Sequence, residues 1–117
     1  MKGKLGDKVR LKHILDAISE VEQYLKLVTY DEFILNSEKR FATIKQIEII
    51  GEACNALSPK LKIANQSVPW KPIIGFRNIS IHEYFGINLL LVWEIAKNDL
   101  PQLEKQMKLI YDSFLEQ

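Results

Sequence analysis

Cysteine, glycine, proline and long apolar runs are all scarce in this sequence. Its single cysteine, Cys54, can form neither an internal disulfide nor a cysteine-based zinc site, and its apolar neighbours predict a buried, unreactive thiol. Five glycines and four prolines among 117 residues are too few for a fibrous or low-complexity chain. The apolar run Leu89–Trp93 is far shorter than the ~20 residues that cross a bilayer. We therefore expect no membrane segment.

The remaining composition is that of a folded globular protein. Hydrophobic residues make up 47% of the chain and charged residues 26%, so residues 1–117 are expected to form one domain with a real core. The basic N-terminal residues are not followed by the apolar stretch of a signal peptide, because Lys8, Arg10, Lys12 and Asp16 interrupt it. A cytoplasmic location is the resulting expectation.

Acidic residues are absent from Ala53 to His82. This segment carries a net charge of +4, and the rest of the chain carries −3, since the whole chain carries +1. The overall charge is a weak indication of nucleic-acid binding, but the basic segment can attract a polyanion at low salt. A solvated basic surface explains the same charges. The candidate RNA-binding residues in this segment are Lys60, Lys62 and Lys71.

Apolar residues recur at spacings of three and four along most of the chain, which is typical of amphipathic helices. We expect an all-α, up-and-down bundle of four main helices with one or two short helices, and no strands. Gly51 lies inside one apolar stripe and is expected to permit the close approach of a neighbouring helix. The expected helices are one that follows Asp7 and runs to about Val28, one of one to two turns after Thr29, one from Ser37 to near Ser58, a short one over 59–65, one from Trp70 that breaks at Gly86, one over 89–98, and a final one from Asp99 to about Phe114.

Local signals mark the ends of several of these helices. Asp7 is expected to cap the first helix, and Thr29 with Glu32 forms a capping box. Ser58 followed by Pro59 suits an N-cap and a first helical position. Further helix boundaries are expected at Gly86, Asn88 and the pair Asp99 and Pro101.

The stretch "GFRNISIHEYFG" contains the side chains that are best suited to catalysis. Histidine titrates near neutral pH, and His82 lies near an expected helix end, whereas His13 lies in an amphipathic helix where a structural role is favoured. On a straight helix Arg77 and His82 would be about 140° apart, while Asn78 and His82 would share a face. A distorted helix end or a two-fold dimer could bring Arg77 to His82. Spacing alone favours a structural helix end, with Arg77 and Tyr84 as tethers.

The whole chain resembles the HepT-like proteins, a minimal branch of the HEPN superfamily, from about Asp7 to about Met107. The resemblance rests on five segments in this order and spacing: "DKVRLKHILDAISEVEQYL", "IEIIGEACNALSP", "VPWKPIIGFRN", "IHEYFGIN" and "VWEIAKNDLPQLEKQM". Many relatives carry a basic residue where Ile79 stands and an apolar one where Ser80 stands. This departure concerns RNA affinity or substrate choice and leaves the catalytic pair intact.

The resemblance implies a helical-bundle ribonuclease that is the toxin of a toxin–antitoxin pair. In this family the Arg-x4-His-x-Tyr motif is the active element, matched here by Arg77, His82 and Tyr84, with Asn78 as the supporting polar residue. Such proteins are homodimers whose motifs meet in an interface cleft and act on RNA such as tRNA or mRNA. The resemblance also implies a minimal nucleotidyltransferase antitoxin, which adds AMP to the motif tyrosine.

The side chains suit a reaction without metal or cofactor. Glu48 and Glu52 lie one helical turn apart, but Lys45 is nearby and a solvated face explains them more simply than a metal site. We expect His82 to take the proton from a ribose 2′-OH and Arg77 to hold the phosphate. Two alternatives remain at this point: a non-catalytic dimeric module that regulates a nucleotidyltransferase, and a purely structural bundle.

Overall fold

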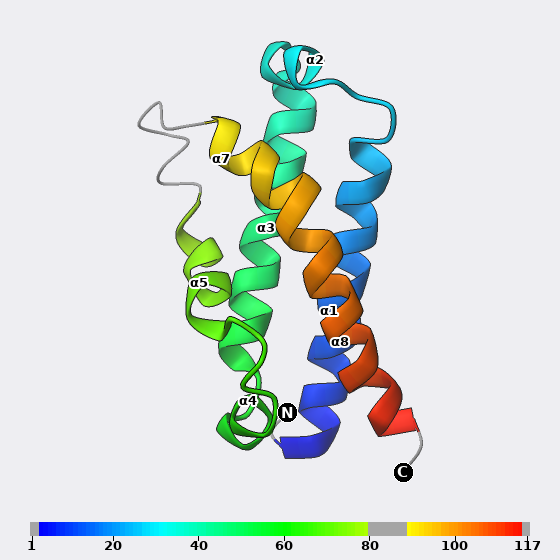
Figure 1. The fold of residues 1–117 in the computed structure, drawn as a ribbon, viewed down its shortest axis with the longest axis vertical. Coiled ribbons are helices and arrows are strands. Elements are labelled where there is room, and N and C mark those ends of the chain that lie inside the picture. Colours follow the sequence, from blue (N-terminus) through cyan, green and yellow to red (C-terminus); the bar gives the residue numbers. More distant parts are fainter. Residues whose placement is uncertain (1–2, 80–88, 116–117) are drawn as a thin grey trace.

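The computed structural model describes residues 3–79 and 89–115, and the all-α helical bundle expected from the sequence is confirmed within them (Figure 1). The expected helix boundaries at Gly86 and Asn88 lie outside the described residues. None of the described helices combines the length and the apolar character needed to cross a membrane. The elements are α1 (Gly3–Tyr24), α2 (Tyr30–Leu35), α3 (Ser37–Ala56), α4 (Pro59–Ala64), α5 (Trp70–Gly75), the 3-10 turn η1 (Phe76–Asn78), α7 (Leu89–Glu94), the π-helical turn η2 (Ile95–Asp99) and α8 (Leu100–Leu115).

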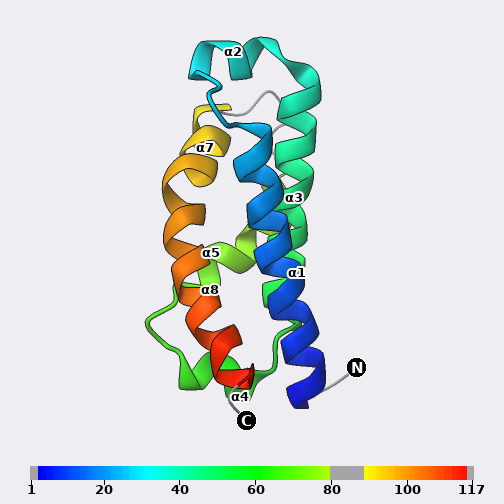
Figure 2. The ribbon, with the colours of Figure 1, turned by 90° about the vertical axis from the view of Figure 1, so that its right-hand side faces the viewer.

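The long helices run up and down the bundle. α1 and α3 are antiparallel, and the shorter α5 packs beside α3. The continuous segment from α7 to α8 runs antiparallel to α1 (Figures 1 and 2). α1 packs against both α3 and α8, and α3 also contacts α5 and η1. The apolar stripes of these elements form the core, so burial of one face of each helix holds the bundle together. Fully buried examples are Leu11, Ile14, Ile18, Ile47, Ile50, Leu100 and Met107.

Two predicted helix starts are confirmed in atomic detail. At α2, the Glu32 backbone N–H donates to Thr29 Oγ1 at 3.2 Å and the Thr29 backbone N–H donates to Glu32 Oε1 at 3.2 Å, which completes the capping box. At α4, Ser58 Oγ accepts a hydrogen bond from the Leu61 backbone N–H at 3.2 Å, and Pro59 follows at the first helical position.

The prediction that Asp7 caps the first helix is wrong. α1 already begins at Gly3, so Asp7 lies in its second turn with only 4% of its surface exposed. Its carboxylate instead accepts hydrogen bonds from the backbone N–H of Ser58 at 2.8 Å and from Ser58 Oγ at 2.6 Å. Asp7 therefore joins α1 to the start of α4, far away along the chain.

The last part of the bundle is continuous. α8 begins at Leu100, beside the expected boundary at Asp99, but the π-helical turn η2 connects it directly to α7. Pro101 has no backbone N–H to donate to the carbonyl of Lys97, so the regular α-helical hydrogen bond cannot form there, and the rare π-helical turn η2 directly precedes this irregularity.

Gly51 lies where α3 contacts η1, and the close approach predicted for it is confirmed. A Cβ atom at Gly51 would lie 2.4 Å from the backbone nitrogen of Arg77 and 3.0 Å from the carbonyl carbon of Phe76. Real Cβ atoms essentially never come so close to backbone. The missing side chain therefore lets the backbone that carries Arg77 rest directly on α3.

Replacing Asp7 by alanine should destabilise the fold by about 1.5–3 kcal/mol, because two hydrogen bonds to a buried carboxylate are lost. Urea denaturation measures this change. Asp16→Ala is the matched control, since Asp16 forms an exposed ion pair with Lys12 at 3.1 Å and should cost less than about 1 kcal/mol. Equal losses in the two variants would show that the contact between α1 and α4 contributes little.

Gly51→Ala should destabilise the protein by about 1–3 kcal/mol, because the new methyl group must displace the backbone of η1. Gly75→Ala is the control: no atom lies within 4 Å of a Cβ there, its φ is −60°, and alanine should be neutral or stabilise by up to about 1 kcal/mol. Thermal denaturation of both variants distinguishes crowding from a general effect of glycine replacement. A neutral Gly51→Ala would contradict the close packing.

Candidate functional site

Arg77 lies in η1, the 3-10 turn that extends α5. The chain tightens from 3.6 to about 3 residues per turn over Phe76–Asn78, so the straight-helix projection of the motif does not hold across this turn. The Arg77 side chain is exposed, and no hydrogen bond or ion pair joins it to the described part of the chain. Asn78 follows in the same turn and is also exposed. Both side chains are therefore accessible to a ligand.

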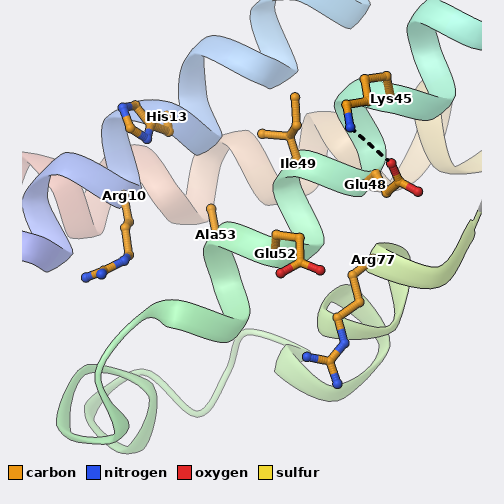
Figure 3. Close-up of a pocket in the computed structure, with 8 residues that line it drawn as sticks. All are labelled: Arg10, His13, Lys45, Glu48, Ile49, Glu52, Ala53 and Arg77. Carbon is orange, nitrogen blue, oxygen red and sulfur yellow. Dashed lines mark ion pairs between the residues drawn. The ribbon is translucent and has the colours of Figure 1, made fainter.

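A hollow of about 520 Å³ lies beside Arg77, between α1, α3 and η1 (Figure 3). Its volume falls within the range of about 300–1,000 Å³ that is common for ligand sites. Arg77 lines it from η1, while Arg10 and His13 line it from α1. Two helical segments distant in sequence thus bring cationic or ionisable side chains to the same concave surface.

The floor of the hollow is formed by α3. Ile49 and Ala53 provide an apolar strip, and Lys45, Glu48 and Glu52 provide polar groups around it. Lys45 Nζ lies 3.5 Å from Glu48 Oε1, so these two charges largely compensate each other. In Figure 3, Glu52 lies on the side of α3 that faces Arg77. Lys45 and Glu52 are exposed as expected, Glu48 is only partly exposed, and all three line the hollow.

The other predicted site residues are placed elsewhere or not at all. His82 and Tyr84 lie outside the described residues. Lys60 and Lys71 are exposed on α4 and α5, and neither lines the hollow. Lys62 Nζ donates to the carbonyl oxygens of Cys54 at 3.3 Å and Asn55 at 3.1 Å, at the C-terminal end of α3.

The prediction of a buried thiol at Cys54 is confirmed. Cys54 has no exposed surface, and burial raises the pKa of its thiol to about 12, although the nearby charge of Lys62 opposes the shift. Cys54 therefore stays protonated and unreactive at neutral pH. In the described part of the chain, no three side chains of the His, Cys, Asp or Glu type are grouped closely enough to hold a metal ion.

Sequence reasoning did not assign Arg10 or His13 to the site. Their spacing of three residues places them on the same face of α1, which was a usable signal. What the sequence could not provide was the rotation of α1 relative to α3, because this depends on how the side chains of the two helices interlock.

Comparisons with known proteins show which family this chain belongs to. Residues 14–110 match the family model described as "Ribonuclease HepT-like". The chain is 40% identical to "Putative RNase MJ1380" of Methanocaldococcus jannaschii, over 88% of this chain and 94% of that protein. It is 37% identical to "Putative RNase TTE0752" of Caldanaerobacter subterraneus, over 84% and 88%.

A further relative carries the family name itself. The chain is 31% identical to "Probable ribonuclease HepT" of Thermococcus cleftensis, over 86% of this chain and 92% of that protein. No solved structure gives a significant match. From the family match over most of its length and from these relatives, the chain belongs to the HepT-like ribonuclease family.

Proposed function

We propose that this protein is an endoribonuclease that cleaves RNA without a metal ion, and that it is the toxin of a toxin–antitoxin pair. The observation that carries the proposal is the exposed Arg77 guanidinium beside a hollow of ligand size, in a chain of the HepT-like ribonuclease family. The motif residues His82 and Tyr84 are present at the expected spacing after Arg77. The substrate is a cytoplasmic RNA such as a tRNA or an mRNA.

In the proposed reaction His82 takes the proton from a ribose 2′-OH, and the resulting oxygen attacks the adjacent phosphorus. The bond from phosphorus to the 5′ oxygen of the next nucleotide breaks, and that oxygen takes up a proton. The products are a 2′,3′-cyclic phosphate and a 5′-OH. Arg77 donates paired N–H groups to the phosphate and stabilises the charge that develops in the transition state. Asn78 orients His82 or contacts the RNA.

We propose that the active unit is a homodimer in which two copies of the motif form one cleft. The accessible position of Arg77 and Asn78 at the edge of the bundle leaves room for a second copy to approach. Lys60 and Lys71, exposed on α4 and α5, would add attraction for the RNA backbone. Lys62, whose ammonium group also supports the end of α3, is expected to add less.

His82→Ala should lower the rate of RNA cleavage by about 10²–10⁴-fold through loss of the general base. Arg77→Ala should lower it by about 10²–10³-fold through loss of transition-state stabilisation. Cleavage of a labelled RNA by purified protein measures both effects. Arg77→Ala should retain the wild-type melting temperature, because Arg77 forms no hydrogen bond with the described residues.

Lys105→Ala on α8 is the control for loss of a single exposed positive charge, and it should cleave at the wild-type rate. Full activity of His82→Ala, or cleavage by the wild type that disappears in EDTA, would contradict the mechanism. A purified wild type that binds a nucleotidyltransferase but never cleaves RNA would support a non-catalytic regulatory module instead.

We further propose that a minimal nucleotidyltransferase is the antitoxin and that it transfers AMP to Tyr84. In this transfer the tyrosine oxygen attacks the α-phosphorus of ATP and pyrophosphate leaves. The added group is bulky and anionic, and it lies two residues from His82, where it would exclude RNA and occupy the phosphate site of Arg77.

Co-expression with such a nucleotidyltransferase should increase the mass of the peptide containing Tyr84 by one AMP, and RNA cleavage should be lost. Tyr84→Phe is the control, since it has no hydroxyl group to modify and should remain toxic in the co-expressing cells. Mass spectrometry that finds Tyr84 unmodified while cleavage is still inhibited would contradict this form of regulation.

A further inference from the structure

The proposed reaction uses only the Arg77 side of the hollow, and the rest of its lining has no role in that reaction. Arg77 lies on one side, the apolar strip of Ile49 and Ala53 lies in the middle, and Arg10 with His13 lies on the opposite side (Figure 3). Cationic groups therefore lie at the two ends of the concave surface, with the apolar strip between them and the Glu52 carboxylate between that strip and Arg77. A single-stranded nucleic acid presents the complementary order of phosphate, nucleoside and phosphate.

We propose that Arg10 and His13 form a second phosphate-binding subsite, which holds the RNA strand away from the cleaved bond. This inference rests on the proposed ribonuclease function. Arg77 binds the reacting phosphate, a ribose or base packs on Ile49 and Ala53, and the α1 residues bind a phosphate further along the strand. The guanidinium of Arg10 suits a phosphate through paired N–H donors, and a ring nitrogen of His13 supplies a further donor.

The residues that line the hollow place this subsite on its α1 side, where Arg10 and His13 lie. On α3, Lys45 is paired with Glu48 at 3.5 Å, so neither contributes a strong net field. Glu52 faces Arg77 rather than α1, as Figure 3 shows, and it reduces the positive potential on the Arg77 side. Lys12 belongs to the same turn of α1 but pairs with Asp16 at 3.1 Å and does not line the hollow. The subsite therefore depends on which face of α1 is turned to α3.

The experiment measures RNA binding as a function of salt, because each phosphate contact adds to the salt dependence. A fluorescent single-stranded RNA is titrated with the otherwise intact full chain carrying His82→Ala, so that cleavage is too slow to disturb the binding measurement. Adding Arg10→Ala and His13→Ala should weaken binding about 5- to 20-fold at low salt. It should also reduce the slope of log K against log salt by about 0.7 or more, the value for one phosphate contact on a single strand.

Lys12→Ala in the same background is the matched control, since it removes a positive charge from the same helix turn outside the hollow. It should leave the slope unchanged. A second readout uses substrate length with cleavage-competent protein: Arg10→Ala and His13→Ala should raise KM for long RNAs and leave cleavage of a dinucleotide unaffected.

Several outcomes would overturn the subsite. If the wild type cleaves RNA but the Arg10 and His13 variant has the same slope as Lys12→Ala, the subsite fails and the ribonuclease stands. If light scattering shows that the variant loses its dimer while the slope per protomer is unchanged, these residues belong to a subunit interface. If the wild type neither binds nor cleaves RNA, the proposed function fails and the subsite fails with it.

Discussion

The contact between Gly51 and the backbone of Arg77 is the constraint on which the site depends. Only a residue without a side chain allows η1 to rest on α3 at this distance. Because η1 is held by its backbone, the Arg77 side chain remains available on the outer surface. A rigid support beneath an exposed guanidinium is a suitable arrangement for electrostatic stabilisation, since the backbone that carries the donor is positioned before the substrate binds. Gly51 therefore determines both how η1 packs on α3 and where the Arg77 side chain lies.

Local patterns predicted the parts of the fold that depend on local contacts. The capping box at Thr29 and the cap at Ser58 each follow from the chemistry of a few neighbouring residues. At Gly51 the sequence predicted a close approach, but the partner, the backbone of Arg77, lies far away along the chain. Asp7 was misread because its partner, Ser58, lies 51 residues away in the chain. A short polar residue near a helix start looks the same in the sequence whether it caps its own helix or a distant one.

In the candidate site too, some residues were identified from the sequence and others were missed. The motif residue Arg77 was identified from sequence, and its accessible position supports that choice. The contribution of α1 was not identified, because Arg10 and His13 reach the hollow only through the packing of α1 on α3. The basic segment was also less uniform than its charge suggested, since Lys62 donates to carbonyl oxygens at the end of α3. The net charge of the basic segment therefore indicated attraction for a polyanion, but it did not indicate which side chains form the binding surface.

The central claim is that this helical bundle cleaves RNA by attack of the ribose 2′-OH, and the ends of the cleaved RNA test it most directly. Purified protein is incubated with a defined RNA in EDTA, and the product ends are identified by mass spectrometry. Our account predicts a 2′,3′-cyclic phosphate on one fragment and a 5′-OH on the other. Fragments with a 3′-OH and a 5′-phosphate would contradict it, because a water molecule rather than the 2′-OH would then have attacked the phosphate.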